Sequence, residues 1–203
     1  MIKIIREVPW KEIETRVRRV ALLERRNGRK LYPYAEAQVK LKDLDLREFY
    51  PTTYYLIEKN LRVQENLMKT LHSQNHGLFH MTGGLEITDG NTVWTLTPPV
   101  VEASVENVRP EAGNRSQKTS RVQLNLLIDG AHRIFLARRL GITTITAIHI
   151  SNIPEDCPFY AYPNSWEEVG VHPAAPALKK HYRDVSGYAL YRDLATINGS
   201  APR

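Results

Sequence analysis

The stretch that decides the fold is residues 124–148, which read LNLLIDGAHRIFLARRLGITTITAI. An apolar run over residues 122–128 predicts a strand that stops at Gly130. A helical pattern over residues 131–140 follows and ends at a glycine, where helices commonly stop. Residues 142–150 are rich in Ile and Thr, which is typical of a strand. The stretch therefore predicts strand, helix and strand, with an abrupt turn at Gly130.

The turn between this strand and this helix predicts a phosphate site. A helix that begins at a glycine presents free backbone N–H groups, and Gly130 lets a ligand approach the backbone closely. His132 and Arg133 lie in the first helical turn, where the helix dipole disfavours cations, so their presence favours a bound anion. In the purely structural alternative, Asp129 caps the helix, Arg133 is solvated and His132 is a hydrogen-bonded core side chain.

Residues 124–148 resemble the signature of the ParB/sulfiredoxin superfamily: a hydrophobic strand, Asp-Gly-x-His-Arg, an alanine-containing helix, Leu-Gly and a β-branched strand. The resemblance implies an α+β fold with a ParB/sulfiredoxin-like mixed sheet and flanking helices. We expect a basic helical extension at residues 1–37, the core at residues 38–150, and a proline-rich tail packed on the core at residues 151–203.

The branches of this superfamily differ in chemistry. Sulfiredoxins carry a catalytic cysteine where this chain has Ala131, and the single cysteine is Cys157, so sulfinic acid reduction is not expected. Chromosome-partition members continue into a helix-turn-helix domain, whereas a proline-rich segment follows the motif here. The chain is closest in character to the free serine kinases, which carry Asp-Gly-x-His-Arg without the cysteine or a DNA-binding tail.

That resemblance implies a nucleotide-dependent phosphotransferase acting on a hydroxylated metabolite, with an amino acid as one candidate. It implies ATP or ADP with Mg²⁺. By the resemblance, Gly130, Ala131, His132 and Arg133 would hold the nucleotide phosphates. Asp129 would position metal or accept the hydroxyl proton, and His132 would take part in catalysis. We therefore lean toward an enzyme.

An acid from the segment before the first core helix would assist the reaction, again by resemblance. Glu48 is the preferred candidate, and Asp43, Asp45 and Glu102 are its rivals. Glu102 and Trp166 are candidate substrate-binding residues. Protein ligands for a metal stay unidentified, because isolated carboxylates are usually solvated surface residues.

The basic character of the chain is confined to its N-terminus. The net charge is +6, and residues 1–30 hold 10 basic and 4 acidic side chains, while the other residues hold 18 of each. Residues 10–26 predict an amphipathic helix. A basic helix attracts nucleic-acid phosphates, so a non-catalytic nucleotide- or nucleic-acid-binding module, or a nuclease, stays an alternative. A solvated helix face is the plainer interpretation.

Periodicity and turn residues predict the other elements, and Asp89-Gly90 is typical of a hairpin turn. We expect a strand at 36–42, a loop at 43–51, a helix at 54–72, strands within 78–103, a loop at 106–121 and short helices within 177–196.

Composition excludes several classes of protein. One cysteine allows no intramolecular disulfide and no Cys-only zinc site. No apolar run approaches the ~20 residues of a membrane span, and charged residues interrupt the N-terminus where a signal peptide would be apolar. We therefore expect a cytoplasmic protein with no membrane partner, and the resemblance implies a nucleotide and a small molecule as partners. The oligomeric state is not indicated.

Overall fold

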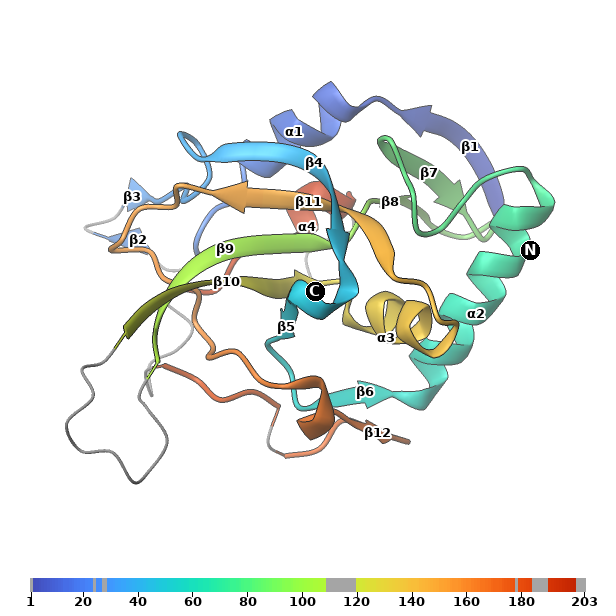
Figure 1. Cartoon of the computed structure of the whole chain (residues 1–203). Coiled ribbons are helices and arrows are strands. Elements are labelled where there is room, and N and C mark those ends of the chain that lie inside the picture. The colour runs from blue at the N-terminus through green and yellow to red at the C-terminus, as the bar shows by residue number, and fades with distance from the viewer. Residues whose placement is uncertain are drawn as a thin grey trace.

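A computed structural model describes residues 2–23, 25–26, 29–108, 120–177, 179–183 and 190–199. Its centre is a five-stranded sheet in the order β4-β11-β9-β10-β5 (Figure 1). Pairing is antiparallel between β4 and β11 and between β9 and β10, and parallel between β11 and β9 and between β10 and β5. The strands are β4 (Gln38–Asp45), β5 (Phe49–Pro51), β9 (Val100–Val108), β10 (Ser120–Asp129) and β11 (Thr144–Ser151). The expected α+β class, with a mixed sheet and flanking helices, is confirmed.

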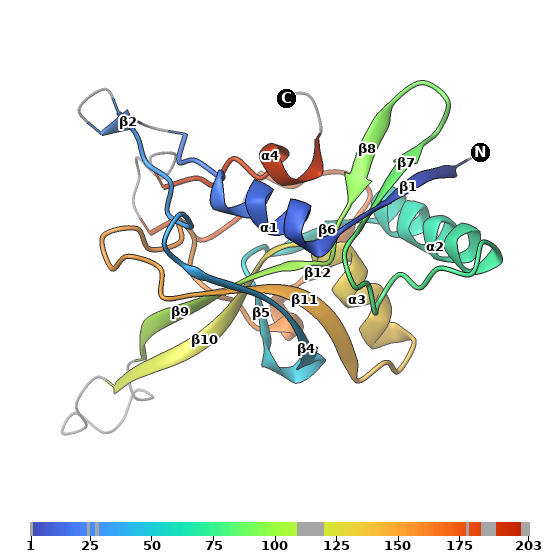
Figure 2. The same ribbon diagram turned by 90° about the horizontal axis from the view of Figure 1, so that it is seen from above.

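Apolar side chains alternate along the central strands, so each face of the sheet carries its own core. On β11, Ile145 and Ala147 pack with α2 and α3, whereas Ile148 and Ile150 pack with α1 and α4. Helices α1 and α4 lie side by side (Figure 2). The helices are α1 (Trp10–Arg18), α2 (Glu58–Ser73), α3 (Ala131–Arg139) and α4 (Ala195–Asn198).

A second, antiparallel sheet has the order β1-β7-β8, with strands Lys3–Val8, Gly84–Thr88 and Val93–Leu96. The Asp89-Gly90 turn joins β7 to β8 as predicted, with Gly90 at φ 103°. The Asp89 carboxylate accepts hydrogen bonds from the backbone N–H groups of Asn91 and Thr92, which fixes the turn. Strand β1 was not predicted, because its mixed charged and apolar residues follow neither the period of 2 of a strand nor the period of 3.6 of a helix.

Short elements complete the described chain. Strand β6 pairs in parallel with β12, and β2 pairs with β3. Their bounds are β2 (Arg25–Arg26), β3 (Arg29–Lys30), β6 (Tyr55–Ile57) and β12 (Gly170–His172), with 3-10 turns at Leu46–Glu48 and Trp166–Glu168. No helix in these ranges is long and apolar enough to cross a bilayer.

The N-terminal helix is shorter than predicted, and its extent over 10–26 is wrong. It ends at Arg18, because Arg19 and Val20 form a tighter turn with backbone hydrogen bonds to Arg16 and Val17. Leu22 donates its backbone N–H to Leu31, and Leu23 donates to Tyr191 in the tail. Pairing with distant segments therefore overrides the local helical pattern.

Other boundaries shift for the same reason. The helix predicted from residue 54 begins at Glu58, because β6 takes the preceding residues. The loop predicted at 43–51 is largely strand, since β4 continues against β11 and β5 pairs with β10. Residues 78–81 are a largely buried non-strand segment rather than a strand.

Two predicted segments fall partly outside the described ranges. Strands β9 and β10 take the ends of the loop predicted at 106–121, and residues 109–119 lie outside the described residues. Of the helices predicted within 177–196, the described part contains only α4, and residues 184–189 are outside it.

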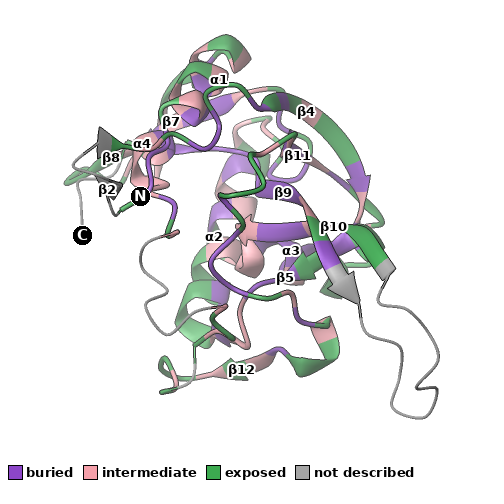
Figure 3. Cartoon of the chain, turned by 90° about the vertical axis from the view of Figure 1, so that its left-hand side faces the viewer, coloured by how far each residue is buried: buried purple, intermediate pink, exposed green. Residues whose placement is uncertain are grey.

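The C-terminal segment lies across the sheet. Phe159 and Tyr160 pack on Leu126 of β10, on the face opposite α3. Buried positions follow the central strands and the inner sides of the helices (Figure 3). The tail therefore contributes to the core and can bring side chains to the motif.

Candidate functional site

The site begins where β10 turns into α3. The register of β10 on β9 shifts between Leu127 and Asp129, which marks a bulge at the strand end. Gly130 follows at φ 92°, and a Cβ there would lie 2.8 Å from Cβ of Pro99. Both the left-handed backbone and the close approach of Pro99 therefore require glycine at this turn.

A pocket with a volume of about 550 Å³ lies at this turn. We call it the α2–α3 pocket because the first residues of both helices border it. The first backbone N–H groups of a helix have no acceptor within that helix. The dipoles of the two helices add positive potential at their N-termini. Its polar lining includes Thr52, Thr53, Asn60, Asp129, His132 and Lys180.

His132 joins the two helix starts. Its Nε2 accepts a hydrogen bond of 3.0 Å from the backbone N–H of Ile57, the residue before α2. Burial lowers the pKa of His132, and Asp129 offsets this only in part. The ring is therefore neutral near pH 7, with its proton on Nδ1, where it can donate to an oxygen.

Arg133 turns inward from the same helical turn. It is 7% exposed, and its Nη1 donates to the carbonyl of Thr97 at 2.5 Å. Its buried Nε has no partner among the described residues. Burial lowers the pKa of Arg133 to about 10, with a partial offset from Asp129. The side chain is not solvated, and its contact with phosphate stays a prediction.

Asp129 is the carboxylate of this site. The N-cap of α3 is Gly130, without a side-chain cap hydrogen bond, so the alternative in which Asp129 caps the helix is wrong. No described side chain or backbone group hydrogen-bonds to its carboxylate, although it attracts the nearby charges of His132, Arg133 and Lys180. Its oxygens are therefore available to a ligand.

With this geometry in place, comparison with known proteins supplies the family. The model of the ParB CE domain matches residues 12–170, most of the chain. The chain belongs to the ParB CE domain family. No curated protein and no solved structure matches it. The ParB-like resemblance is thus confirmed for this ParB CE domain, and the kinase-like character stays a prediction.

The predicted upstream acids of the ParB CE domain lie away from the α2–α3 pocket. Glu48 is outside the pocket lining and lies 3.4 Å from the amide nitrogen of Asn125. Asp45 binds Arg47, and Asp43 accepts a hydrogen bond from Thr146 on the neighbouring strand. The structure therefore brings none of these acids to Asp129.

The two predicted substrate-binding residues, Glu102 and Trp166, lie outside the α2–α3 pocket. Glu102 is 1% exposed and both its oxygens bind Arg192, so it has no surface to offer a substrate. The Trp166 indole donates to the carbonyl of Phe49 at 2.9 Å, and Arg138 lies over its ring. Trp166 therefore packs against side chains of α3, outside the pocket lining.

Sequence reasoning missed the contribution of distant segments to the pocket. Thr52 and Thr53 come from the turn after β5, and Asn60 comes from α2. Lys180 comes from the tail, beyond the matched residues 12–170. A lysine in a proline-rich tail carries no local signal for such a position.

The donor set of the pocket allows a limited test of the expected Mg²⁺. Asp129 is the single carboxylate among the described lining residues, and no three His, Cys, Asp or Glu side chains gather in the described ranges. Mg²⁺ commonly binds one or two carboxylates together with substrate phosphates and water. The residues present therefore fit a nucleotide-borne Mg²⁺ through Asp129, rather than an all-protein metal site.

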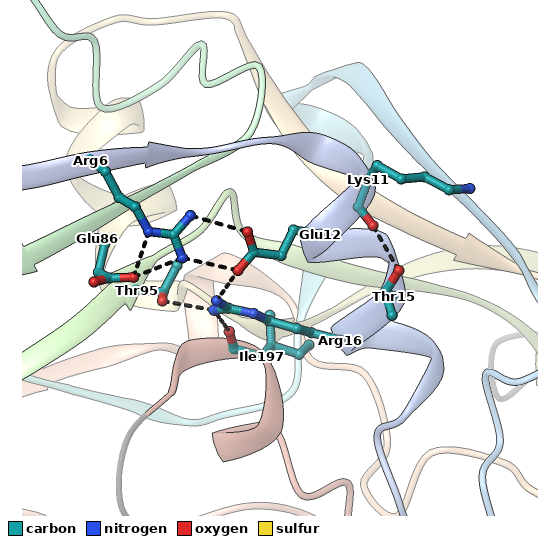
Figure 4. A network of polar contacts seen from close by, with 8 residues as sticks. All are labelled: Arg6, Lys11, Glu12, Thr15, Arg16, Glu86, Thr95 and Ile197. Carbon is teal, nitrogen blue, oxygen red and sulfur yellow. Dashed lines mark hydrogen bonds and ion pairs between the residues drawn. The ribbon is translucent and has the colours of Figure 1, made fainter.

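Two basic residues of β1 and α1, Arg6 and Arg16, are engaged within the fold (Figure 4). Arg6 bonds to Glu12 and Glu86, at 3.1 Å in each case. Arg16 bonds to Glu12 and to the carbonyl of Ile197 in α4. These arginines tie β1, α1, β7 and α4 together, so much of the N-terminal charge serves packing.

Proposed function

We propose that this ParB CE domain is a nucleotide-dependent phosphotransferase acting on a small hydroxylated metabolite, with an amino acid as one candidate. The observation that carries the proposal is Asp129. Its carboxylate has no hydrogen-bond partner among the described residues and lines a pocket bordered by two helix N-termini. Such a pocket favours phosphate, and such a carboxylate suits a proton acceptor.

Each group has a distinct part in this proposal. The N–H groups of Ala131 and His132 and the two helix dipoles hold phosphate oxygens. The Nδ1–H of His132 donates to a further oxygen. Asp129 accepts the proton of the substrate hydroxyl as the hydroxyl oxygen bonds to the terminal phosphorus. The bond from that phosphorus to its bridging oxygen breaks, and the nucleotide, one phosphate shorter, leaves. Mg²⁺, when bound, would neutralise charge on the phosphates. Positioning and electrostatics then carry most of the rate enhancement, as phosphoryl transfer requires.

A non-catalytic nucleotide-binding module is the second candidate. The observation that favours it is that Asp129 is the single carboxylate among the described lining residues, because Glu48 and Glu102 lie elsewhere. Binding of nucleic acid, or cleavage of it, has less support, since Arg6 and Arg16 form ion pairs within the fold.

Titration calorimetry with ATP and ADP in the presence of Mg²⁺, followed by phosphoryl transfer to a panel of hydroxylated metabolites, tests the proposal. We expect Asp129→Asn to keep nucleotide affinity and to lower turnover by about 10²–10⁴-fold. Glu48→Gln, which removes a carboxylate outside the pocket, is the matched control and should stay within a few-fold of wild type.

Three outcomes decide between the candidates. Full turnover in Asp129→Asn would remove Asp129 from catalysis. Nucleotide binding without transfer to any acceptor would favour the non-catalytic module. A wild-type protein that binds no nucleotide would reject both candidates.

A further inference from the structure

Lys180 is the one cation of the tail that reaches the α2–α3 pocket within the described residues. Its ammonium donates to the Thr52 carbonyl at 3.0 Å and to the Thr52 hydroxyl at 3.1 Å. Its Nζ also lies 5.3 Å from the ring centre of Tyr160. Two of its three N–H donors are thus satisfied by Thr52, and no hydrogen-bond acceptor among the described residues takes the third.

The tail holds Lys180 in place on both sides. The carbonyl of Lys179 accepts a hydrogen bond from the backbone N–H of Tyr54 at 3.4 Å. On the other side, Arg183 forms an ion pair of 2.6 Å with the buried Glu106 and donates to the carbonyl of Phe159. The ammonium is therefore positioned by its neighbours before any ligand arrives, which favours tight binding.

The charge of Lys180 is poorly compensated. Among the described residues it forms no ion pair within 4.0 Å, and Asp129 attracts it only through space. Burial lowers the pKa of Lys180 to about 8, and Asp129 offsets this only in part. A partly buried cation without a close counter-charge is unfavourable, so an anion in the pocket would stabilise it.

We infer that Lys180 binds the phosphates of the nucleotide in the α2–α3 pocket, so that a tail segment beyond the matched residues 12–170 completes the site. The inference rests on the proposed function for the identity of the ligand. Its chemistry, a polyphosphate against an ammonium and two helix N-termini, follows from the pocket itself.

Binding of ATP and of inorganic tripolyphosphate to the full chain tests this inference. Lys180→Met should weaken binding of both by about tenfold to a hundredfold, because a charged hydrogen bond is lost. Lys179→Met removes the same charge from an exposed neighbouring side chain and should leave binding within about twofold. Melting temperatures of the two variants show whether each remains folded.

The pH dependence of phosphate affinity distinguishes a lysine that contacts the phosphates from one that only supports the fold. Only a lysine in contact makes the affinity depend on its own protonation. The charged and titratable groups that line this pocket or contact Lys180 are Asp129, His132, Arg133, Tyr55 and Tyr160, and the pKa of Arg133, about 10, lies above the range tested. From about pH 7 to about pH 9 the His132 ring stays neutral, because burial lowers its pKa, and the terminal phosphate stays ionised. The affinity of the wild type for ATP and tripolyphosphate should therefore fall as pH rises through about 8, because Lys180 loses its charge. The affinity of Lys180→Arg should not change over this range, because arginine stays charged.

Each outcome is decisive. Equal affinities for Lys180→Met, Lys179→Met and wild type would overturn the inference and leave the proposed function standing. Weakened tripolyphosphate binding without any ATP binding would support the phosphate contact and reject the nucleotide. Wild type that binds neither probe would overturn the inference together with the proposed function.

Discussion

Two regions of the molecule contain buried or partly buried charged side chains. They differ in whether the hydrogen-bonding groups of those side chains all have partners within the protein. The first is the cluster of Tyr34, Glu102 and Arg192, which we call the tail clasp. Glu102 and Arg192 are each 1% exposed, and Arg192 also donates to the carbonyls of Cys157 and Leu190. The Tyr34 hydroxyl donates to Glu102. The clasp therefore leaves no ligand-binding capacity at these carboxylate oxygens.

The second region is the α2–α3 pocket. There Asp129 has no hydrogen-bond partner among the described residues, Arg133 keeps an unpartnered Nε, and Lys180 has a donor to spare. A saturated buried cluster holds segments together, whereas an unsaturated one adjoining a cavity retains the capacity to bind. The comparison separates the residues that fix the tail from those that meet a ligand.

The largest expected effect on the free energy of unfolding comes from a substitution that breaks the tail clasp. Glu102→Gln leaves the Arg192 charge buried without its counter-ion and should lower the free energy of unfolding by about 3–5 kcal/mol in urea titrations. Arg6→Gln, at an ion pair with 44% of the arginine side chain exposed, is the control and should cost at most about 1 kcal/mol. A loss below about 1 kcal/mol in Glu102→Gln would show that the clasp does not hold the tail.

The next effect concerns the backbone of the pocket. Gly130→Ala adds a Cβ at φ 92° and 2.8 Å from Pro99, and should lower the free energy of unfolding by about 2–3 kcal/mol. Gly90→Ala meets the same backbone strain, at φ 103°, in open space. Its cost should be about 1–2 kcal/mol in the same thermal or urea assay. Equal losses would mean that Pro99 moves aside freely.

A smaller effect sharpens the contrast between the two acids. Asp129→Asn should change the free energy of unfolding by less than about 1 kcal/mol, because Asp129 makes no cap hydrogen bond and is only partly buried. Differential scanning calorimetry of Asp129→Asn beside Glu102→Gln makes the comparison directly. A similar loss in both would place Asp129 among the structural charges.

The smallest effect is a pH dependence of stability. Burial lowers the pKa of His132, so near and below pH 6.5 the unfolded chain binds more protons there than the folded chain. Stability should fall as pH falls through this range. His132→Gln should reduce that slope in melting curves. His149→Gln should also reduce the slope, because burial lowers the pKa of that histidine too. An unchanged slope in His132→Gln would argue against the neutral ring.

Local sequence determined the centre of the site. The apolar strand, the glycine turn and the helix of residues 124–148 follow from short-range rules, since φ 92° at Gly130 suits glycine and the periods of 2 and 3.6 are local. The hairpin at Asp89-Gly90 was predictable for the same reason. The mixed sheet followed from the superfamily resemblance.

Only the tertiary structure decided which side chains meet at that centre. Glu48 and Glu102 were plausible partners of Asp129 by resemblance, yet the strand register points one toward Asn125 and buries the other against Arg192. Lys180 reaches the pocket through tail contacts with residues over a hundred positions away. Such long-range pairing depends on how the whole chain packs, and no periodic pattern in the neighbouring sequence encodes it.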